Sequence, residues 1–228
     1  CGLSGFIFPR FQRNSQEIWS GQVRSGPANR RLALDLTCLF AGILLGFFAV
    51  AAVLGAAYVQ AFSGAESVVA ERRSSLADLG VAEFAPILGH NLRVLLVALL
   101  TGVCFRYLGL LFVLIYNAAL WGVVLASGLT RDHGQMSWWD DLVGTVVAVT
   151  PHLLAEGAGY VVAAMAGVFI SRGAQRFRLG SRSLDRVSRA ALRLVAAAAL
   201  LIVVAAGFET YWSKAWANLW FDRVAVMP

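Results

Sequence analysis

Long apolar stretches alternate with short polar segments along this chain, and the alternation predicts its architecture. The apolar stretches cover about residues 32–61, 87–105, 108–129, 142–170 and 190–208. An α-helix needs about 20 residues to cross a hydrocarbon core of roughly 30 Å. Backbone polar groups in lipid must be satisfied within the element itself, which favours helices. The pattern therefore predicts an all-α, polytopic membrane protein with a bundle of five transmembrane helices.

The fourth apolar stretch is expected to break at Pro151. Thr150 is a favourable N-cap residue, and proline is favoured at the first position of a helix. We therefore expect a short interfacial or re-entrant piece over residues 142–149, followed by a full span over residues 151–170. The sequence thus predicts a Pro-broken fourth segment.

The segments outside the spans are polar or amphipathic. Residues 1–31 combine arginine with aromatic side chains and are expected to form a cytoplasmic juxtamembrane segment, while residues 62–86 are expected to contain a short helix outside the membrane. The tail, residues 213–228, is expected to lie at the interface as an amphipathic helix. Tryptophans recur there every four residues, at Trp212, Trp216 and Trp220. One five-helix transmembrane domain, residues 32–212, joins these segments.

Composition and charge fix the class of protein and predict its orientation. The chain is 59% hydrophobic and only 14% charged, whereas a soluble domain carries about 25% charged residues. Of the 19 basic residues, 13 fall on one set of alternating segments and 5 on the other, with Arg93 inside a span. The positive-inside rule therefore predicts a multi-pass protein of the cell (cytoplasmic) membrane, with its N-terminus in the cytoplasm and its C-terminus outside.

The excess of arginine is expected to contact lipid, not nucleic acid, because the basic residues flank apolar spans. The residues expected to anchor to anionic headgroups are Arg172, Arg176, Arg178, Arg182 and Arg186. Cys38 and Cys104 lie within spans and are expected to be packing residues. Cys1 as the first residue has two interpretations. Either the numbering begins inside a longer gene product, which we favour, or cleavage has exposed a lipoprotein-type cysteine.

Six polar residues fall within or at the ends of the apolar spans and form the candidate site. They are Asn91, Arg93, Asn117, His152, Glu156 and Glu209. Ionisable side chains are costly inside a bilayer, so they call for a partner, a ligand or a proton. His152 and Glu156 are four apart and share one helix face, and Arg93 is expected to face Glu156 or Glu209. The predicted topology lets the set converge in the outer half of the bundle.

The motifs that would indicate catalysis or a cofactor are missing from the sequence. His-xxx-Glu is not the His-Glu-xx-His zinc motif, and no second histidine or cysteine pair stands at ligand spacing. There is no nucleophile elbow, phosphate loop or dinucleotide fingerprint. We therefore expect no catalytic residue, no metal, no cofactor and no enzymatic activity.

The order of these polar residues resembles the stage II sporulation protein M family. The resemblance lies in Asn91-Leu92-Arg93 opening the second span, Asn117 in the third, Pro151-His152-Leu153-Leu154-Ala155-Glu156, and Glu209 closing the fifth. It covers about residues 32–212. Leu153 stands where the family motif has glycine, and Ala118 follows Asn117 where the family has glycine. The resemblance implies a shared polar core and, in spore formers, a membrane scaffold that assembles with cell-wall hydrolases.

These observations predict a non-enzymatic scaffold or subunit of a cell-envelope complex. Its expected partners are the lipid bilayer and other membrane or envelope proteins, with a homo-oligomer as one option. The alternative is a transporter or channel component that moves an ion, proton or small solute through the polar cluster, because broken helices bind substrates in transporters. A third hypothesis is an intramembrane hydrolase that uses His152 and Glu156.

Overall fold

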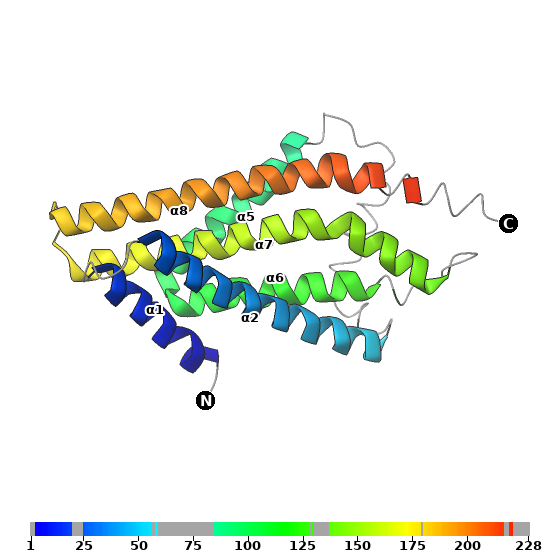
Figure 1. Cartoon of the computed structure of the whole chain (residues 1–228), viewed down its shortest axis with the longest axis horizontal. Helices are drawn as coiled ribbons and strands as arrows, with labels where there is room; N and C mark the ends of the chain where they lie inside the picture. Colours follow the sequence, from blue (N-terminus) through cyan, green and yellow to red (C-terminus); the bar gives the residue numbers. More distant parts are fainter. Residues whose placement is uncertain are drawn as a thin grey trace. The chain divides into compact units, whose positions relative to one another are not determined.

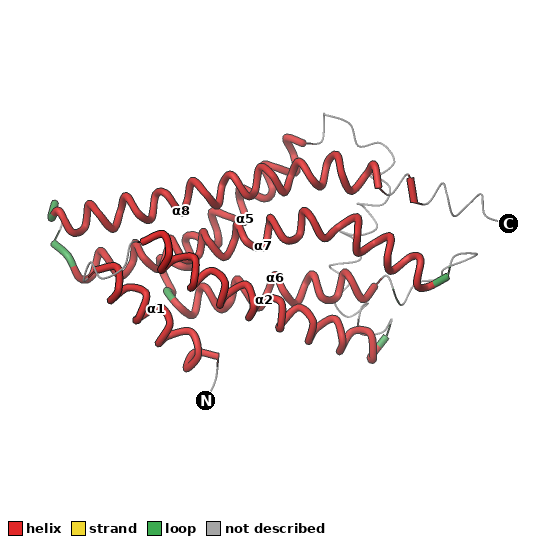
Figure 2. The backbone as a smooth tube through the Cα atoms, in the orientation of Figure 1, coloured by secondary structure: helices red, strands yellow, loops and turns green. Residues whose placement is uncertain are grey.

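The structure is a computed structural model, and all of its regular elements are helices (Figures 1 and 2). It describes residues 3–19, 25–55, 58, 84–127, 129, 137–178, 180–216 and 219–220. No strand occurs among these residues. Of the segment 62–86, in which a short helix is expected, residues 62–83 lie outside the described residues. Cys1 and the end of the tail, residues 221–228, lie outside them as well.

The elements follow the apolar stretches closely. In chain order they are α1 (Leu3–Trp19), α2 (Ser25–Leu54), α5 (Phe84–Phe105), α6 (Tyr107–Ser127), α7 (Trp138–Arg176), α8 (Arg182–Gly207) and the π-helix η2 (Phe208–Ser213). Five helical stretches are long and apolar enough to cross a membrane, the last of them running through η2 to Trp216. The prediction of an all-α fold with five such helices is confirmed.

The predicted break at Pro151 is wrong. Residues 142–149 and 151–170 belong to one helix, α7, which continues for 39 residues with Pro151 inside it. Thr150 does not cap a helix, because its hydroxyl donates back to the carbonyl of Val146, one turn earlier in the same helix. The fourth segment is therefore an unbroken helix, and its proline must be accommodated within it.

The chain is divided into two compact units, each built from three separate stretches of sequence. Unit 1 comprises residues 1–41, 92–116 and 157–201, and unit 2 comprises residues 42–91, 117–156 and 202–228. Three segments carry most of the basic residues and are predicted to lie on one side of the membrane. They are the N-terminal segment, the turn at Arg106 and the arginine-rich stretch after residue 170, and all three belong to unit 1.

In unit 1, the N-terminal segment is a helix that packs against the membrane-spanning helices. Phe11 of α1 is completely buried and meets the rings of Tyr107 and Phe169 edge-on, at centroid distances of 5.1 and 6.1 Å. Glycines permit α5 and α7 to touch. A side chain at Gly102 would meet the backbone of Ala164, and one at Gly167 would meet the backbone of Leu99. Helix α1 thus contributes to the packed core of unit 1.

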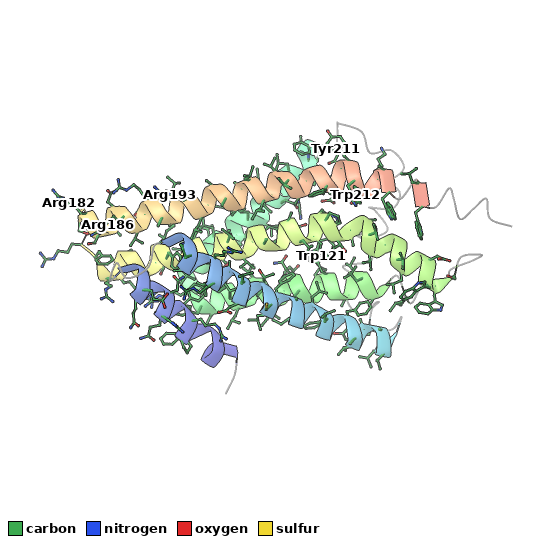
Figure 3. All side chains as sticks on the ribbon, viewed as in Figure 1. Trp121, Arg182, Arg186, Arg193, Tyr211 and Trp212 are labelled. Carbon is green, nitrogen blue, oxygen red and sulfur yellow. The ribbon has the colours of Figure 1, made fainter. Side chains whose placement is uncertain are left out.

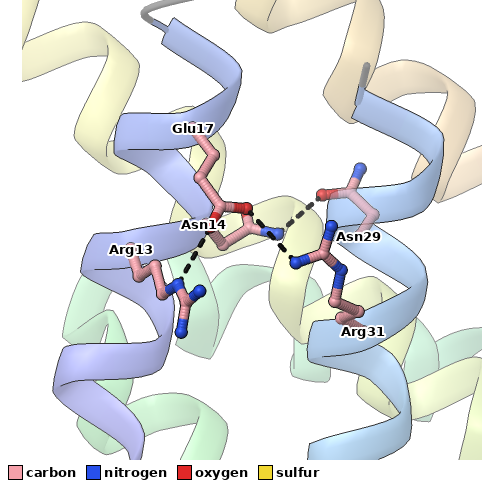
Figure 4. Close-up of polar contacts among 5 residues, drawn as sticks. All are labelled: Arg13, Asn14, Glu17, Asn29 and Arg31. Atoms are coloured by element: carbon pink, nitrogen blue, oxygen red, sulfur yellow. Dashed lines mark hydrogen bonds and ion pairs between the residues drawn. The ribbon is translucent and has the colours of Figure 1, made fainter. Parts of the chain in front are cut away.

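A set of polar contacts joins α1 to α2, and we call it the α1–α2 clasp (Figure 4). Glu17 accepts from Arg13 at 2.9 Å and pairs with Arg31 at 4.0 Å. Further contacts join Asn14 to Asn29 and Arg10 to Asp35. The clasp fixes α1 beside α2 through charged groups that remain partly exposed.

In unit 2, α2 and α6 approach closely at Gly122. A side chain at Gly122 would come within 2.7 Å of the Leu44 carbonyl oxygen. Gly42 and Gly46, whose spacing permits close helix approach, have open space instead, with no described atom within 4 Å of an added Cβ. The Gly42-xxx-Gly46 face of α2 is therefore not used within the described part of the chain.

Candidate functional site

The structure brings three of the six predicted residues together in unit 2. His152 and Glu156 lie one turn apart on α7, and Glu209 comes from η2. Each side chain offers one atom able to bind a metal, and these three atoms lie within 4.8 Å of one another. All three residues are buried, with exposed fractions of 2%, 7% and 7%. We call His152, Glu156 and Glu209 the acid–imidazole cluster.

Ser213 fixes the orientation of the imidazole. Its hydroxyl lies 2.7 Å from the carbonyl oxygen of Ala148, the shorter of its two carbonyl contacts, and 3.4 Å from Nδ1 of His152. A hydroxyl has one proton to donate and two lone pairs to accept with. Because the hydroxyl donates its proton to the carbonyl of Ala148, it accepts a hydrogen bond from His152. This assigns the N–H of the imidazole to Nδ1. Nε2 of His152 is then the basic nitrogen of the ring.

Pro151 explains why side chains from η2 attach to α7 at this place. In an α-helix the amide of residue 151 would bond to the carbonyl of Val147, but proline has no N–H. Nε1 of Trp212 donates to that carbonyl instead, at 3.1 Å, and Ser213 donates to the next one, Ala148. Two consecutive residues of η2 therefore supply donors at the proline, which helps α7 to continue through it.

The π-helical geometry of η2 is a further feature that the sequence analysis missed. Residues Phe208–Ser213 form a π-helix, and Glu209, Thr210 and Ser213 are its buried members. Such turns are rare and occur frequently at functional sites. Glu209 and Ser213, which are four apart, both lie on the buried side of η2. The only sequence signal was that Trp212 and Ser213 come three and four residues after Glu209.

Asn117 and Asn91 are buried in the same unit, on α6 and α5. Trp121, one turn after Asn117, packs its ring edge-on against His152 at a centroid distance of 5.4 Å. The side-chain nitrogen of Asn91 has no hydrogen-bond acceptor among the described residues. The hydroxyl of Thr210 has no hydrogen-bond partner among them either. Asn117 and Asn91 are thus two further buried amide side chains of unit 2.

Arg93 does not share this burial, so the expectation that it faces Glu156 or Glu209 as a buried ion pair is corrected. Its side chain is exposed, whereas Asn91, two residues earlier, is 2% exposed. Residues two apart on a helix do not face the same side. Burial of Asn91 therefore turns Arg93 away from the interior.

The five arginines expected to anchor to lipid do not all behave alike. Arg176, Arg178, Arg182 and Arg186 are exposed. Figure 3 shows Arg182 and Arg186 at the beginning of α8. Arg172 is half-buried, because its guanidinium lies over the ring of Tyr107 and donates to the carbonyl of Phe11 at 3.4 Å. Arg172 therefore holds α1 to α7, which a sequence-based assignment could not separate from lipid anchoring.

The three tail tryptophans form a stacked row. Trp212 stacks on Trp216, and Trp216 on Trp220, at centroid distances of 6.1 and 5.5 Å. Nε1 of Trp220 donates to the carbonyl of Asp140 at 3.1 Å, and its ring leaves no space for a side chain at Gly144. The spacing of four predicted the shared face, but the structure shows that this face packs on α7.

Comparison with known protein families decides the affiliation of the chain. The family described as stage II sporulation protein M matches residues 36–214, which include every residue of the acid–imidazole cluster. This chain belongs to the stage II sporulation protein M family. No curated protein and no solved structure matches it. As a family member it is a membrane protein.

Proposed function

We propose that this stage II sporulation protein M family member is a non-enzymatic membrane subunit that acts as a scaffold in a cell-envelope complex. One observation carries the proposal. Donors from η2 meet the carbonyls of Val147 and Ala148 at Pro151, so the polar residues of the site serve to hold elements together. A site used in this way favours a rigid core over a moving gate.

The transport alternative depended on a helix break at Pro151, and α7 has no such break. Half-helices that end at a midplane site bind substrates in transporters, and a break at Pro151 would have supplied one. Since α7 is continuous, flux of ions or small solutes in proteoliposomes is not expected. Flux that is abolished by Glu156→Gln would favour transport over the scaffold role.

The Gly42-xxx-Gly46 face of α2 is the place to look for a partner helix. Gly102, Gly122 and Gly167 already lie in close backbone contacts, whereas Gly42 and Gly46 have open space around them within the described chain. Small residues at this spacing permit close packing of transmembrane helices. We infer that another membrane protein of the complex contacts α2 there.

A photo-crosslinking amino acid in place of Leu45 tests this inference. Leu45 lies between the two glycines and is 62% exposed, and Leu200 of α8, at 65%, is a matched control. In cells, position 45 is expected to give a protein adduct, and position 200 is expected to give lipid adducts. A solitary monomer in mild detergent, with no protein adduct from position 45, would contradict the scaffold proposal.

The same proposal includes an orientation with the N-terminus in the cytoplasm and the C-terminus outside. It is supported by the arginine-rich segments, all of which begin in unit 1. Reporter fusions at the two ends test it. A cytoplasmic reporter should work at the N-terminus and a periplasmic one at the C-terminus, and the reverse pattern would overturn the orientation.

A further inference from the structure

We propose that His152, Glu156 and Glu209 bind one divalent transition-metal ion, of the Zn²⁺, Mn²⁺ or Fe²⁺ class. The inference does not rest on the scaffold proposal, because it concerns only the geometry and charge of the acid–imidazole cluster.

The spacing of the donor atoms is close to what one metal ion needs. Ligand atoms at about 2.1 Å from a metal lie roughly 3 to 4 Å from one another. The three atoms offered by His152, Glu156 and Glu209 already lie within 4.8 Å of one another. A shift of about 1 Å in the side chains would therefore close the set around an ion.

The hydrogen bond from His152 to Ser213 prepares the imidazole as a ligand. Metal-binding histidines almost always donate their other ring N–H to a neighbouring acceptor, which fixes the tautomer and the ring orientation. Nδ1 of His152 lies 3.4 Å from the Ser213 hydroxyl, and that hydroxyl is itself held by its bond to Ala148. This arrangement makes Nε2 the coordinating nitrogen.

Charge provides the second, independent argument. Two carboxylates lie side by side in apolar spans and are at least nine-tenths buried. Like charges at that separation are unfavourable in a low-dielectric interior unless protons or a cation compensate them. The arginine that the sequence offered for this role, Arg93, is exposed. A divalent ion would neutralise both carboxylates at once.

The donor set determines the class of ion. One imidazole nitrogen with two carboxylate oxygens suits zinc, manganese or ferrous iron. Calcium and magnesium prefer all-oxygen sites, and cuprous copper prefers sulfur. The two described cysteines, Cys38 and Cys104, are exposed on other helices and do not contribute.

Binding would join α7 to η2 at the point where Trp212 and Ser213 already meet α7. Two ligands come from one turn of α7 and the third from η2, 53 residues after Glu156. Metal sites with three protein ligands leave a position for water or another ligand. The ion would thus link the two elements and keep one position open.

The test uses tag-free, full-length protein purified in detergent, stripped with EDTA and dialysed in the absence of oxygen against Zn²⁺, Mn²⁺ or Fe²⁺. We expect one equivalent of metal per chain by mass spectrometry, and a higher unfolding temperature with metal. Glu156→Gln and Glu209→Gln should each lose the stoichiometric metal. Glu17→Gln, which alters the α1–α2 clasp, should keep it. Ser213→Ala should bind about 10- to 100-fold more weakly.

A measurement on the unmodified protein covers the case in which a variant fails to fold. X-ray absorption of the zinc-loaded wild type should show nitrogen and oxygen ligands, including imidazole, and no sulfur. Folded wild-type protein that takes up no equivalent of any of the three metals would overturn the proposal in favour of shared protons. Sulfur ligation, or metal retained after both glutamine substitutions, would also overturn it.

Discussion

Charge is accommodated in different ways in the α1–α2 clasp and in the acid–imidazole cluster. In the clasp, arginines face glutamate and aspartate, and the side chains of the Arg10–Asp35 pair are 37% and 44% exposed. In the cluster, two glutamates and a histidine are gathered with almost no exposure. Solvent and countercharge stabilise the first set, whereas burial removes most of the solvent from the second.

The difference implies that similar substitutions will have very different costs in the two regions. Partly exposed ion pairs contribute little to stability, since water solvates the charges when a partner is lost. Loss of a partner from a buried set leaves an uncompensated charge, which is expensive. Unfolding of the detergent-solubilised protein, followed by circular dichroism during titration with a denaturing detergent, can measure both.

The largest effect is expected for His152→Ala. It removes the imidazole that lies close to two buried carboxylates and also leaves the Ser213 hydroxyl without its nitrogen partner. We expect a loss of about 3 to 5 kcal/mol in the free energy of unfolding. His90→Ala, which changes an exposed histidine on α5, is the control. Equal, small effects of the two substitutions would remove the distinction between the regions.

A smaller loss is expected for Ser213→Ala. The substitution leaves His152 Nδ1 and the carbonyl of Ala148 without their hydroxyl partner in a buried place, which costs about 1 to 3 kcal/mol. Ser188→Ala, at an exposed position of α8, should have no measurable effect. A neutral result at Ser213 would show that the hydroxyl does not hold the imidazole.

Trp212→Phe should cost about 1 kcal/mol, because the carbonyl of Val147 loses its donor. The cost should disappear in a Pro151→Ala background, in which residue 151 regains the N–H that bonds to this carbonyl. Trp139→Phe, at an exposed position, serves as the control. Persistence of the full cost in the alanine background would refute the role assigned to Trp212.

The smallest effect is expected in the clasp. Asp35→Asn removes the ion pair with Arg10, and we expect a loss of less than about 1 kcal/mol. The loss should shrink further at high salt, because screening already weakens partly exposed pairs. A loss as large as that of His152→Ala would show that the two regions are not different in kind.

Most of the fold was predictable from sequence, because it depends on the length and position of apolar runs. Those runs give the five long helices, and the spacing of four placed His152 and Glu156 on one face. Local rules also misled at one place. Thr150-Pro151 has the composition of a helix start, but donors from residues 212 and 213 compensate for the missing N–H. No local pattern reveals partners more than 60 residues away.

The remaining features depend on packing that has no sequence period. Phe11 lies in a segment of mixed polarity, yet it is completely buried. Nothing in the sequence marks the π-helix that contains Glu209 and Ser213, because its residues have the pattern of a regular α-helix. Arg93 could have been assigned correctly, since it lies two positions after Asn91 and therefore on a different face of the helix.

The central claim is that residues from α7 and η2 form one buried site, and a double-mutant cycle tests it most directly. Free energies of unfolding are measured for Glu156→Gln, Glu209→Gln, the double variant and the wild type. We predict a coupling energy above about 1 kcal/mol, because each substitution changes the charge that the other carboxylate experiences. Effects that add within about 0.3 kcal/mol would contradict the claim, since residues that share no site behave additively.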